Sequence, residues 1–195
     1  TADFSLRYCD AAANAVRNVT FELKNGDRIA LDGANGCGKT SLVKAILACN
    51  KDGEAVSSDY KTTGILEVPQ NLIISYISQD TSHLKGSLRD FAREKRLDYT
   101  LLLALLRQLD FERVLFDKDM ELYSEGQKKK VLIASSLLTP AHLYIWDEPL
   151  NYIDVYTRMQ IEKLLLAFRP TMLFVEHDVR FKETIATGVL HMERN

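Results

Sequence analysis

The chain has 195 residues, of which 46% are hydrophobic and 27% charged, and its formal net charge at pH 7 is −2. This balance is typical of a globular protein with one sizeable core, so we expect a single domain over residues 1–195. The charge excludes a strong overall attraction to nucleic acid, and no apolar stretch is long enough to insert into a membrane. Cys9, Cys37 and Cys49 lack the spacing of a zinc site, and no signal peptide is visible, which together favour a reducing cytoplasm.

Strand-like and helix-like apolar patterns alternate along the chain, which indicates an α/β fold with helices packed on a mostly parallel sheet. In chain order, the predicted strands are 21–23, 28–31, 65–68, 72–77, 143–146 and 172–175. The predicted helices are 39–48, two within roughly 88–109, 125–138 and 154–168, with a last helix and strand after them. We interpret 50–64 as an exposed loop, 65–77 as a small β element and about 86–136 as a helical insertion.

A glycine-rich loop joins the strand 28–31 to the following helix. Its residues 33–40, GANGCGKT, match G-x-x-x-x-G-K-[ST] at every fixed position. In such a loop backbone N–H groups surround the β-phosphate, Lys39 reaches the β- and γ-phosphates, and Thr40 binds magnesium. The sequence therefore predicts a nucleoside triphosphate and its Mg²⁺ as ligands, contacted by Asn35, Gly36, Cys37, Gly38, Lys39, Thr40 and Ser41. For Cys37 we favour a space-filling role over a reactive thiol near Lys39.

The strand 143–146 ends on two carboxylates, Asp147 and Glu148. Because ligands collect at the carboxyl ends of strands in open α/β sheets, we expect both at the phosphate site. Asp147 is predicted to hold the magnesium, and Glu148 to act as the general base that polarises the attacking water. An ordinary solvated turn is the alternative, and the four apolar residues before the pair argue against it.

With these residues in place, the sequence resembles the ABC ATPase family over its whole length, with the family's motifs in order. The resemblance implies a P-loop NTPase core with a small antiparallel β element and a helical insertion. It also implies that Gln79 meets the magnesium and the attacking water, that His177 is the switch histidine at the γ-phosphate, and that Asp154 is the aspartate of the D-loop. Tyr8 lies where the family stacks an aromatic ring on adenine; an edge-strand tyrosine is the alternative.

Residues 123–127, YSEGQ, resemble the family's LSGGQ signature ahead of a helix. The resemblance implies that Ser124, Gly126 and Gln127 bind the γ-phosphate held by a second, facing domain, so that each domain supplies half of each ATP site. An isolated domain should then hydrolyse ATP slowly. Glu125 departs from the pattern by replacing a glycine. We expect its charge to repel the partner's triphosphate and to make the two composite sites unequal.

Three lysines, at positions 128–130, follow the signature. We favour a solvated helix face for them, because lysine runs on helices usually keep their ammonium groups in water. Contact with RNA, or compensation of the charge of Glu125, are the alternatives.

The motifs also resemble one branch of the family, the ABC-F class. The run 126–131 (GQKKKV), the phrase 146–154 (WDEPLNYID) and the short insertion between Gln79 and Ser124 carry this resemblance. It implies the second nucleotide-binding domain of a cytoplasmic protein that acts on the ribosome and confers antibiotic resistance. The alternative is the ATPase subunit of a membrane ABC transporter, which shares the catalytic residues. A DNA-tethering ABC ATPase is disfavoured because no heptad run is present.

Overall fold

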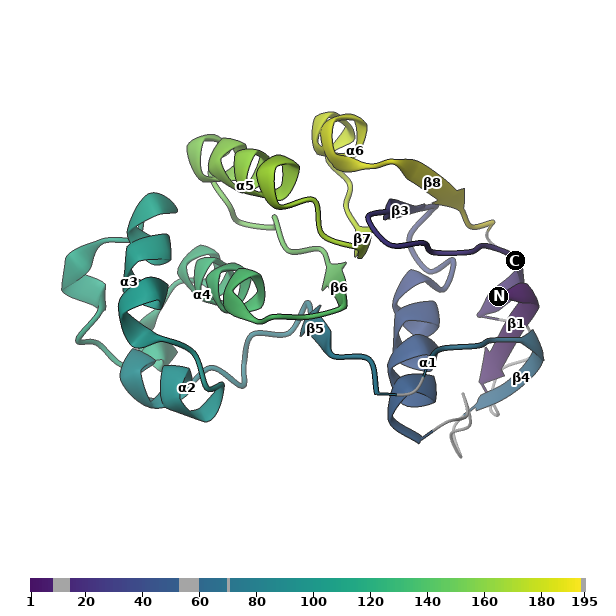
Figure 1. The fold of residues 1–195 in the computed structure, drawn as a ribbon, viewed down its shortest axis with the longest axis horizontal. Helices are drawn as coiled ribbons and strands as arrows, with labels where there is room; N and C mark the ends of the chain where they lie inside the picture. The colour runs from purple at the N-terminus through teal and green to yellow at the C-terminus, as the bar shows by residue number, and fades with distance from the viewer. Residues whose placement is uncertain (9–14, 53–59, 70, 194–195) are drawn as a thin grey trace.

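The computed structural model describes residues 1–8, 15–52, 60–69 and 71–193. Its strands form a central parallel sheet in the order β5-β6-β7-β3-β8 and a separate antiparallel sheet in the order β2-β1-β4 (Figure 1). The strands are β1 (Ala2–Tyr8), β2 (Val16–Val19), β3 (Arg28–Asp32), β4 (Tyr60–Ile65), β5 (Ile74–Ile77), β6 (Leu143–Asp147), β7 (Met172–Val175) and β8 (Gly188–His191). The predicted P-loop fold with its two kinds of sheet is thus confirmed.

Helices cover both faces of the central sheet, with α5 and α6 above it and α1 between it and the antiparallel sheet (Figure 1). The α-helices are α1 (Lys39–Asp52), α2 (Leu88–Glu94), α3 (Tyr99–Gln108), α4 (Glu125–Leu138), α5 (Val155–Phe168) and α6 (Val179–Ile185). Two 3₁₀ turns, η1 (Arg113–Leu115) and η2 (Met120–Leu122), connect α3 to α4. Among the described residues, no helix is long and apolar enough to cross a membrane.

Each face of the central sheet carries its own hydrophobic core, because successive side chains of a strand point to opposite faces. Trp146 and Phe174 belong to the core shared with α4, α5 and α6, whereas Ile145 and Val175 belong to the core around α1. Burial on both faces explains why β6 and β7 consist almost entirely of apolar residues. These two strands were the clearest in the sequence for that reason.

Side-chain caps start the helices of the insertion. Ser87 accepts a hydrogen bond from the backbone N–H of Asp90 at the start of α2. Ser124 and Gln127 form a reciprocal capping box at the start of α4. These two hydrogen bonds fix where α4, the helix that follows the signature residues 123–127, begins.

The predictions for the exposed β element were partly wrong. Residues 21–23 form no strand, because the backbone of Phe21 bonds to the N-terminal residue Thr1 instead of to a strand. The predicted loop 50–64 begins with the last residues of α1, which continues to Asp52, and it ends within β4. Of the predicted strand 65–68, only Ile65 lies in a strand. Side chains of β4 are largely exposed, so its sequence lacks the apolar alternation that identifies buried strands.

Candidate nucleotide site

The carboxyl ends of four neighbouring strands meet at one edge of the central sheet. The phosphate loop, residues 33–40, follows β3, and Gln79 follows β5. Asp147 ends β6, and Glu176 follows β7. Segments more than 100 residues apart in the sequence, such as Thr40 and Asp147, are therefore in hydrogen-bond contact.

The phosphate loop needs glycine at two positions because other parts of the backbone lie against it. A Cβ atom on Gly33 would lie 2.4 Å from the carbonyl oxygen of Met192, and one on Gly38 would lie 1.9 Å from that of Ala15. Gly38 also has a φ of +97°, which side-chain-bearing residues rarely adopt. The loop is thus a close-packed backbone cradle, with Asn35 and the neighbouring Gly36 at its exposed rim.

Lys39 starts α1 with its ammonium group inside this cradle. Its Nζ atom donates to the carbonyl oxygens of Gly33, at 2.6 Å, and Ala34, at 3.1 Å. The Sγ atom of Cys37 lies 3.9 Å from the same nitrogen and is buried against the loop. This packing agrees with the space-filling role of Cys37. Ser41, on the first turn of α1, is half-buried.

Asp147 is fully buried, and the two other predicted metal ligands contact it. The Thr40 hydroxyl donates to Oδ2 at 2.9 Å, and the Gln79 amide donates to Oδ1 at 3.1 Å. Burial raises the pKa of Asp147, while these two hydrogen bonds oppose the rise.

The donor set fits magnesium. A hydroxyl, a carboxylate and an amide oxygen are the hard ligands that Mg²⁺ takes from proteins, with phosphate oxygens and water supplying the others. No cluster of three or more His, Cys, Asp or Glu side chains in the described part of the chain could hold a metal by itself.

Glu148 follows Asp147 with a left-handed backbone, φ +50°, that turns its side chain away from the strand direction. One carboxylate oxygen accepts from the side-chain amide of Asn151 at 2.8 Å, and the other lies 3.4 Å from Nε2 of His177. The structure thus brings together Glu148 and His177, two of the three residues predicted to act in catalysis; Gln79 is the third. Asn151 escaped the sequence analysis, although its place three residues after Glu148, in the same turn, is a usable signal.

Glu176 is a second residue that the sequence analysis missed. The residue is 4% exposed, and its carboxylate accepts from the backbone N–H groups of Leu150, at 2.8 Å, and His177, at 3.2 Å. Burial raises the pKa of Glu176. It ties the segment after Glu148 to the switch histidine. A carboxylate directly after a buried strand was the signal that identified Asp147, and the same signal applies here.

The signature residues lie at the start of α4. The backbone N–H of Gln127 donates to the Ser124 hydroxyl at 3.3 Å, and Gln127 Oε1 accepts from the Ser124 N–H at 2.9 Å. A Cβ atom on Gly126 would lie 2.4 Å from the carbonyl oxygen of Tyr152, so the signature packs closely on the D-loop, residues 149–154. Within the described residues, no hydrogen bond joins this group to the phosphate loop.

Asp154 caps α5 and pairs with the signature helix. Its carboxylate accepts from the backbone N–H of Thr157 at 2.8 Å and lies 3.0 Å from the ammonium of Lys130. Lys129 and Lys130 are both buried, so the predicted solvated face is wrong for these two lysines. Each has a backbone carbonyl as hydrogen-bond acceptor, which the sequence pattern does not reveal.

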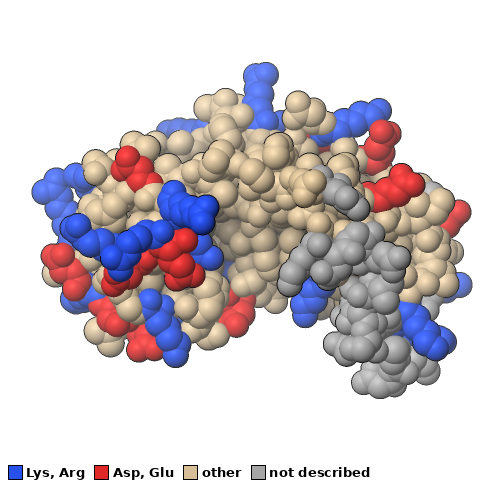
Figure 2. All heavy atoms as spheres, turned by 60° about the horizontal axis from the view of Figure 1, so that its bottom comes forward, with Lys and Arg blue, Asp and Glu red and all other residues tan. Residues whose placement is uncertain are grey.

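Charged side chains of both signs are interleaved over the helical insertion on the face that Figure 2 shows, at the left of the view. In and next to the helical insertion, Arg93 pairs with Asp90, and the Lys85 ammonium lies 3.2 Å from the Glu121 carboxylate. Pairing of this kind leaves no extended basic surface on that face.

The adenine contact predicted for Tyr8 falls at the end of β1. The Tyr8 side chain lies outside the described residues, and the stacking role stays a prediction.

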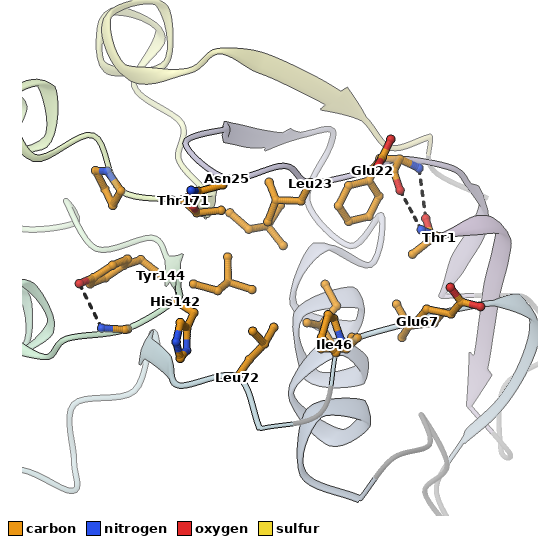
Figure 3. A pocket seen from close by; sticks show the side chains of 18 of the residues that line it. Thr1, Glu22, Leu23, Asn25, Ile46, Glu67, Leu72, His142, Tyr144 and Thr171 are labelled. Atoms are coloured by element: carbon orange, nitrogen blue, oxygen red, sulfur yellow. Dashed lines mark hydrogen bonds between the residues drawn. The ribbon is translucent and has the colours of Figure 1, made fainter.

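A cavity of about 720 Å³ lies at the opposite, amino-terminal end of the central sheet (Figure 3). Apolar side chains such as Ile46 and Leu72 form much of its wall, together with His142 and Tyr144 (Figure 3). None of the predicted site residues lines it. The nucleotide site is therefore at the other end of the sheet.

Two relatives match most of the chain in sequence. It is 30% identical over 190 residues to the ATP-binding protein Uup of Buchnera aphidicola subsp. Acyrthosiphon pisum, covering 92% of this chain and 30% of that protein. It is 25% identical over 184 residues to ABC transporter F family member 5 of Arabidopsis thaliana, covering 91% and 25%. The chain therefore spans less than a third of the length of these relatives.

A solved structure has the same fold: the dimeric post-hydrolysis state of the ATP-binding cassette MJ0796 bound to ADP and phosphate. Its TM-score with this chain is 0.69 at 18% identity, covering 98% of this chain and 96% of that one. The sequence model of the ABC transporter family matches residues 16–151. The chain thus belongs to the ABC transporter family and is one of its ATP-binding domains, for which ATP hydrolysis is the general activity.

Proposed function

We propose that residues 1–195 form one domain, with a helical subdomain at about 86–136, which binds MgATP and hydrolyses it as half of a facing pair. The observation that carries the proposal is the cluster of Thr40, Gln79 and Asp147 with Glu148 directly beside it. Three separate segments of the chain supply these groups at one edge of the sheet. A purely structural role would not require this convergence.

In the proposed mechanism, the phosphate loop and Lys39 hold the β- and γ-phosphates, and Tyr8 stacks on adenine. Thr40, Asp147 and Gln79 would hold Mg²⁺, which neutralises phosphate charge. Glu148 accepts a proton from the water whose oxygen attacks the γ-phosphorus, and ADP leaves as the bond to its β-phosphate oxygen breaks. His177, 3.4 Å from Glu148, orients that carboxylate and contacts the γ-phosphate.

The second half of the site comes from a facing domain. Ser124 is exposed at the start of the 14-residue helix α4, where backbone N–H groups favour an anion, and Gly126 and Gln127 follow it. Asp154 lies beside them through its ion pair with Lys130. We assign Ser124, Gly126 and Gln127 to the γ-phosphate bound by the partner, and Asp154 to the D-loop beside that nucleotide. The dimeric form of the cassette with the same fold supports this arrangement.

Replacing Glu148 by glutamine tests the assignment. ATP hydrolysis should fall by about 10² to 10⁴, the usual general-base contribution, while ATP binding remains. Glu183→Gln, on the exposed side of α6, is a matched control that should leave turnover unchanged. An unaltered rate in Glu148→Gln would remove Glu148 from its role.

For the whole protein, we propose the second nucleotide-binding domain of a cytoplasmic ABC-F protein that protects the ribosome from antibiotics. The relatives support the ABC-F class, and the motifs at 126–131 and 146–154 resemble members that confer resistance. The full-length Glu148→Gln protein should co-sediment with ribosomes in ATP and not in ADP. Absence of the protein from the ribosome pellet in both nucleotides would instead favour the transporter subunit, which should co-purify with a membrane permease.

A further inference from the structure

Helix α4 holds the glutamine loop, residues 78–82, at two points on either side of Gln79. Before it, the Nζ atom of Lys129 donates to the backbone carbonyl of Ser78 at 3.0 Å. After it, the hydroxyl of Thr81 donates to Oε2 of Glu125 at 2.6 Å. Both holding residues lie in the first turns of the signature helix. The loop that carries Gln79 is thus attached to the helix that carries the signature.

Lys129 and Thr81 are largely shielded from water, whereas the side chain of Glu125 is half exposed. Lys129 is 2% exposed and Thr81 is 4% exposed. A buried ammonium group is costly unless charges or hydrogen bonds compensate it. Burial lowers the pKa of Lys129, and the nearby carboxylates of Asp147 and Glu148 oppose that change. The cation therefore lies within electrostatic reach of the catalytic carboxylates.

Glu125 is engaged with its own domain. The hydrogen bond from Thr81 and the ammonium of Lys128, 3.2 Å from Oε1, hold the pKa of Glu125 below its usual range. A hydrogen bond to an ionised carboxylate is stronger than one between neutral groups. The residue that replaces a signature glycine thus has a specific partner in the glutamine loop.

We infer that Glu125 and Lys129 are positioning residues that fix the glutamine loop so that the Gln79 amide stays on Asp147. That contact measures 3.1 Å between Nε2 and Oδ1. Ser124, in the same turn of α4, is where we propose that the second domain docks. The two contacts therefore connect the docking site to the predicted Mg²⁺ ligands Gln79 and Asp147 of this domain. The inference rests on the proposed ATPase function and deepens it.

A different role for Glu125 follows from its sequence position alone. If its charge mainly repels the partner's triphosphate, Glu125→Ala should accelerate hydrolysis and Thr81→Val should have no effect. If it positions the loop, both substitutions should impair hydrolysis in the same way. The two roles therefore predict opposite results for Glu125→Ala.

The test compares Thr81→Val, Glu125→Ala and the double variant in the full-length protein. Each should lower kcat about tenfold, because a hydrogen bond to a charged group is lost, and should raise the Mg²⁺ concentration needed for half-maximal turnover. The double variant should be no worse than either single variant, since both remove one contact. Thr81→Ser keeps the hydroxyl and should restore turnover, and Thr100→Val, an exposed threonine of α3, is the control.

Hydrogen exchange of residues 78–82 gives a second readout that does not depend on turnover. Exchange there should increase in Thr81→Val, Glu125→Ala and Lys129→Met, with unfolding midpoints showing that the variants are folded. Unchanged exchange, or faster exchange with unchanged kcat and Mg²⁺ dependence, would overturn the positioning role. Faster hydrolysis by Glu125→Ala would overturn it in favour of charge repulsion. If the wild-type protein hydrolyses no ATP, the proposed function fails, and the exchange results still decide whether the contacts hold the loop.

Discussion

Replacing Glu176 by alanine should loosen the junction between the D-loop and the switch histidine. Leu150 is 2% exposed, so its backbone N–H would be left buried without an acceptor, at a cost of about 1–3 kcal/mol. Loss of the buried methylene groups adds roughly 1 kcal/mol. We therefore expect Glu176→Ala to lower the free energy of unfolding by about 2–4 kcal/mol. Urea unfolding followed by the fluorescence of Trp146, the single tryptophan, measures this.

Glutamine at position 176 is the matched control, because it keeps the volume and an acceptor oxygen for Leu150. Burial raises the folded-state pKa of Glu176, so its protonation stabilises the fold at low pH, and this contribution is lost as the pH rises through the folded pKa. The free energy of unfolding of Glu176→Gln minus that of wild type should therefore be larger at pH 7 than at pH 4. Equal unfolding free energies for the Ala and Gln variants, within about 0.5 kcal/mol, would refute the role of the buried N–H group.

Three further changes test other contacts. Gly126→Ala should destabilise the fold by roughly 1–3 kcal/mol, because its Cβ would lie 2.4 Å from the carbonyl oxygen of Tyr152; thermal unfolding measures this, and an unchanged midpoint would contradict the close packing. Burial tends to raise the pKa of Asp154, but hydrogen bonds from the first turn of α5 and from Lys130 outweigh it and lower the pKa to about 2. Asp154 should therefore stabilise the protein at neutral pH and lose this contribution as the pH falls from about 4 toward 2. The difference in unfolding free energy between wild type and Asp154→Asn, measured at low salt, should shrink over this range. Cys37 should react slowly with an alkylating reagent whether or not ATP is present, because its thiol is buried; rapid labelling that ATP prevents would favour the reactive thiol.

Sequence patterns identified β6 and β7 well because these two strands are buried on both faces. The segment 72–77, predicted to be part of a small β element, instead contains β5, a partly exposed edge strand of the central sheet. The start and end of α4 and the strand β7 have the predicted bounds, and Asp147 extends the predicted strand 143–146 by one residue. The phosphate loop could be recognised because close backbone contacts restrict Gly33 and Gly38 to glycine. Where burial on both faces is lost, as in β4, the pattern became ambiguous and the prediction failed.

The site was predictable for residues whose own sequence context carries a motif, and not for residues defined by distant partners. Lys129 looks like a solvated lysine until the fold brings the carbonyl of Ser78 to it. Thr81 has no motif at all, and its role depends on Glu125, 44 residues away. Such contacts depend on how α4 packs against β5. The spacing of apolar residues along the sequence does not reveal that packing.

The pairing of two domains around ATP is the central claim, and light scattering of Glu148→Gln measures it most directly. In MgATP, with hydrolysis blocked, the mass of the 195-residue chain should double, whereas in ADP it should remain that of a monomer. Adding Ser124→Ala should weaken the pair without preventing nucleotide binding. A chain that binds ATP and stays monomeric at every concentration tested would contradict the account.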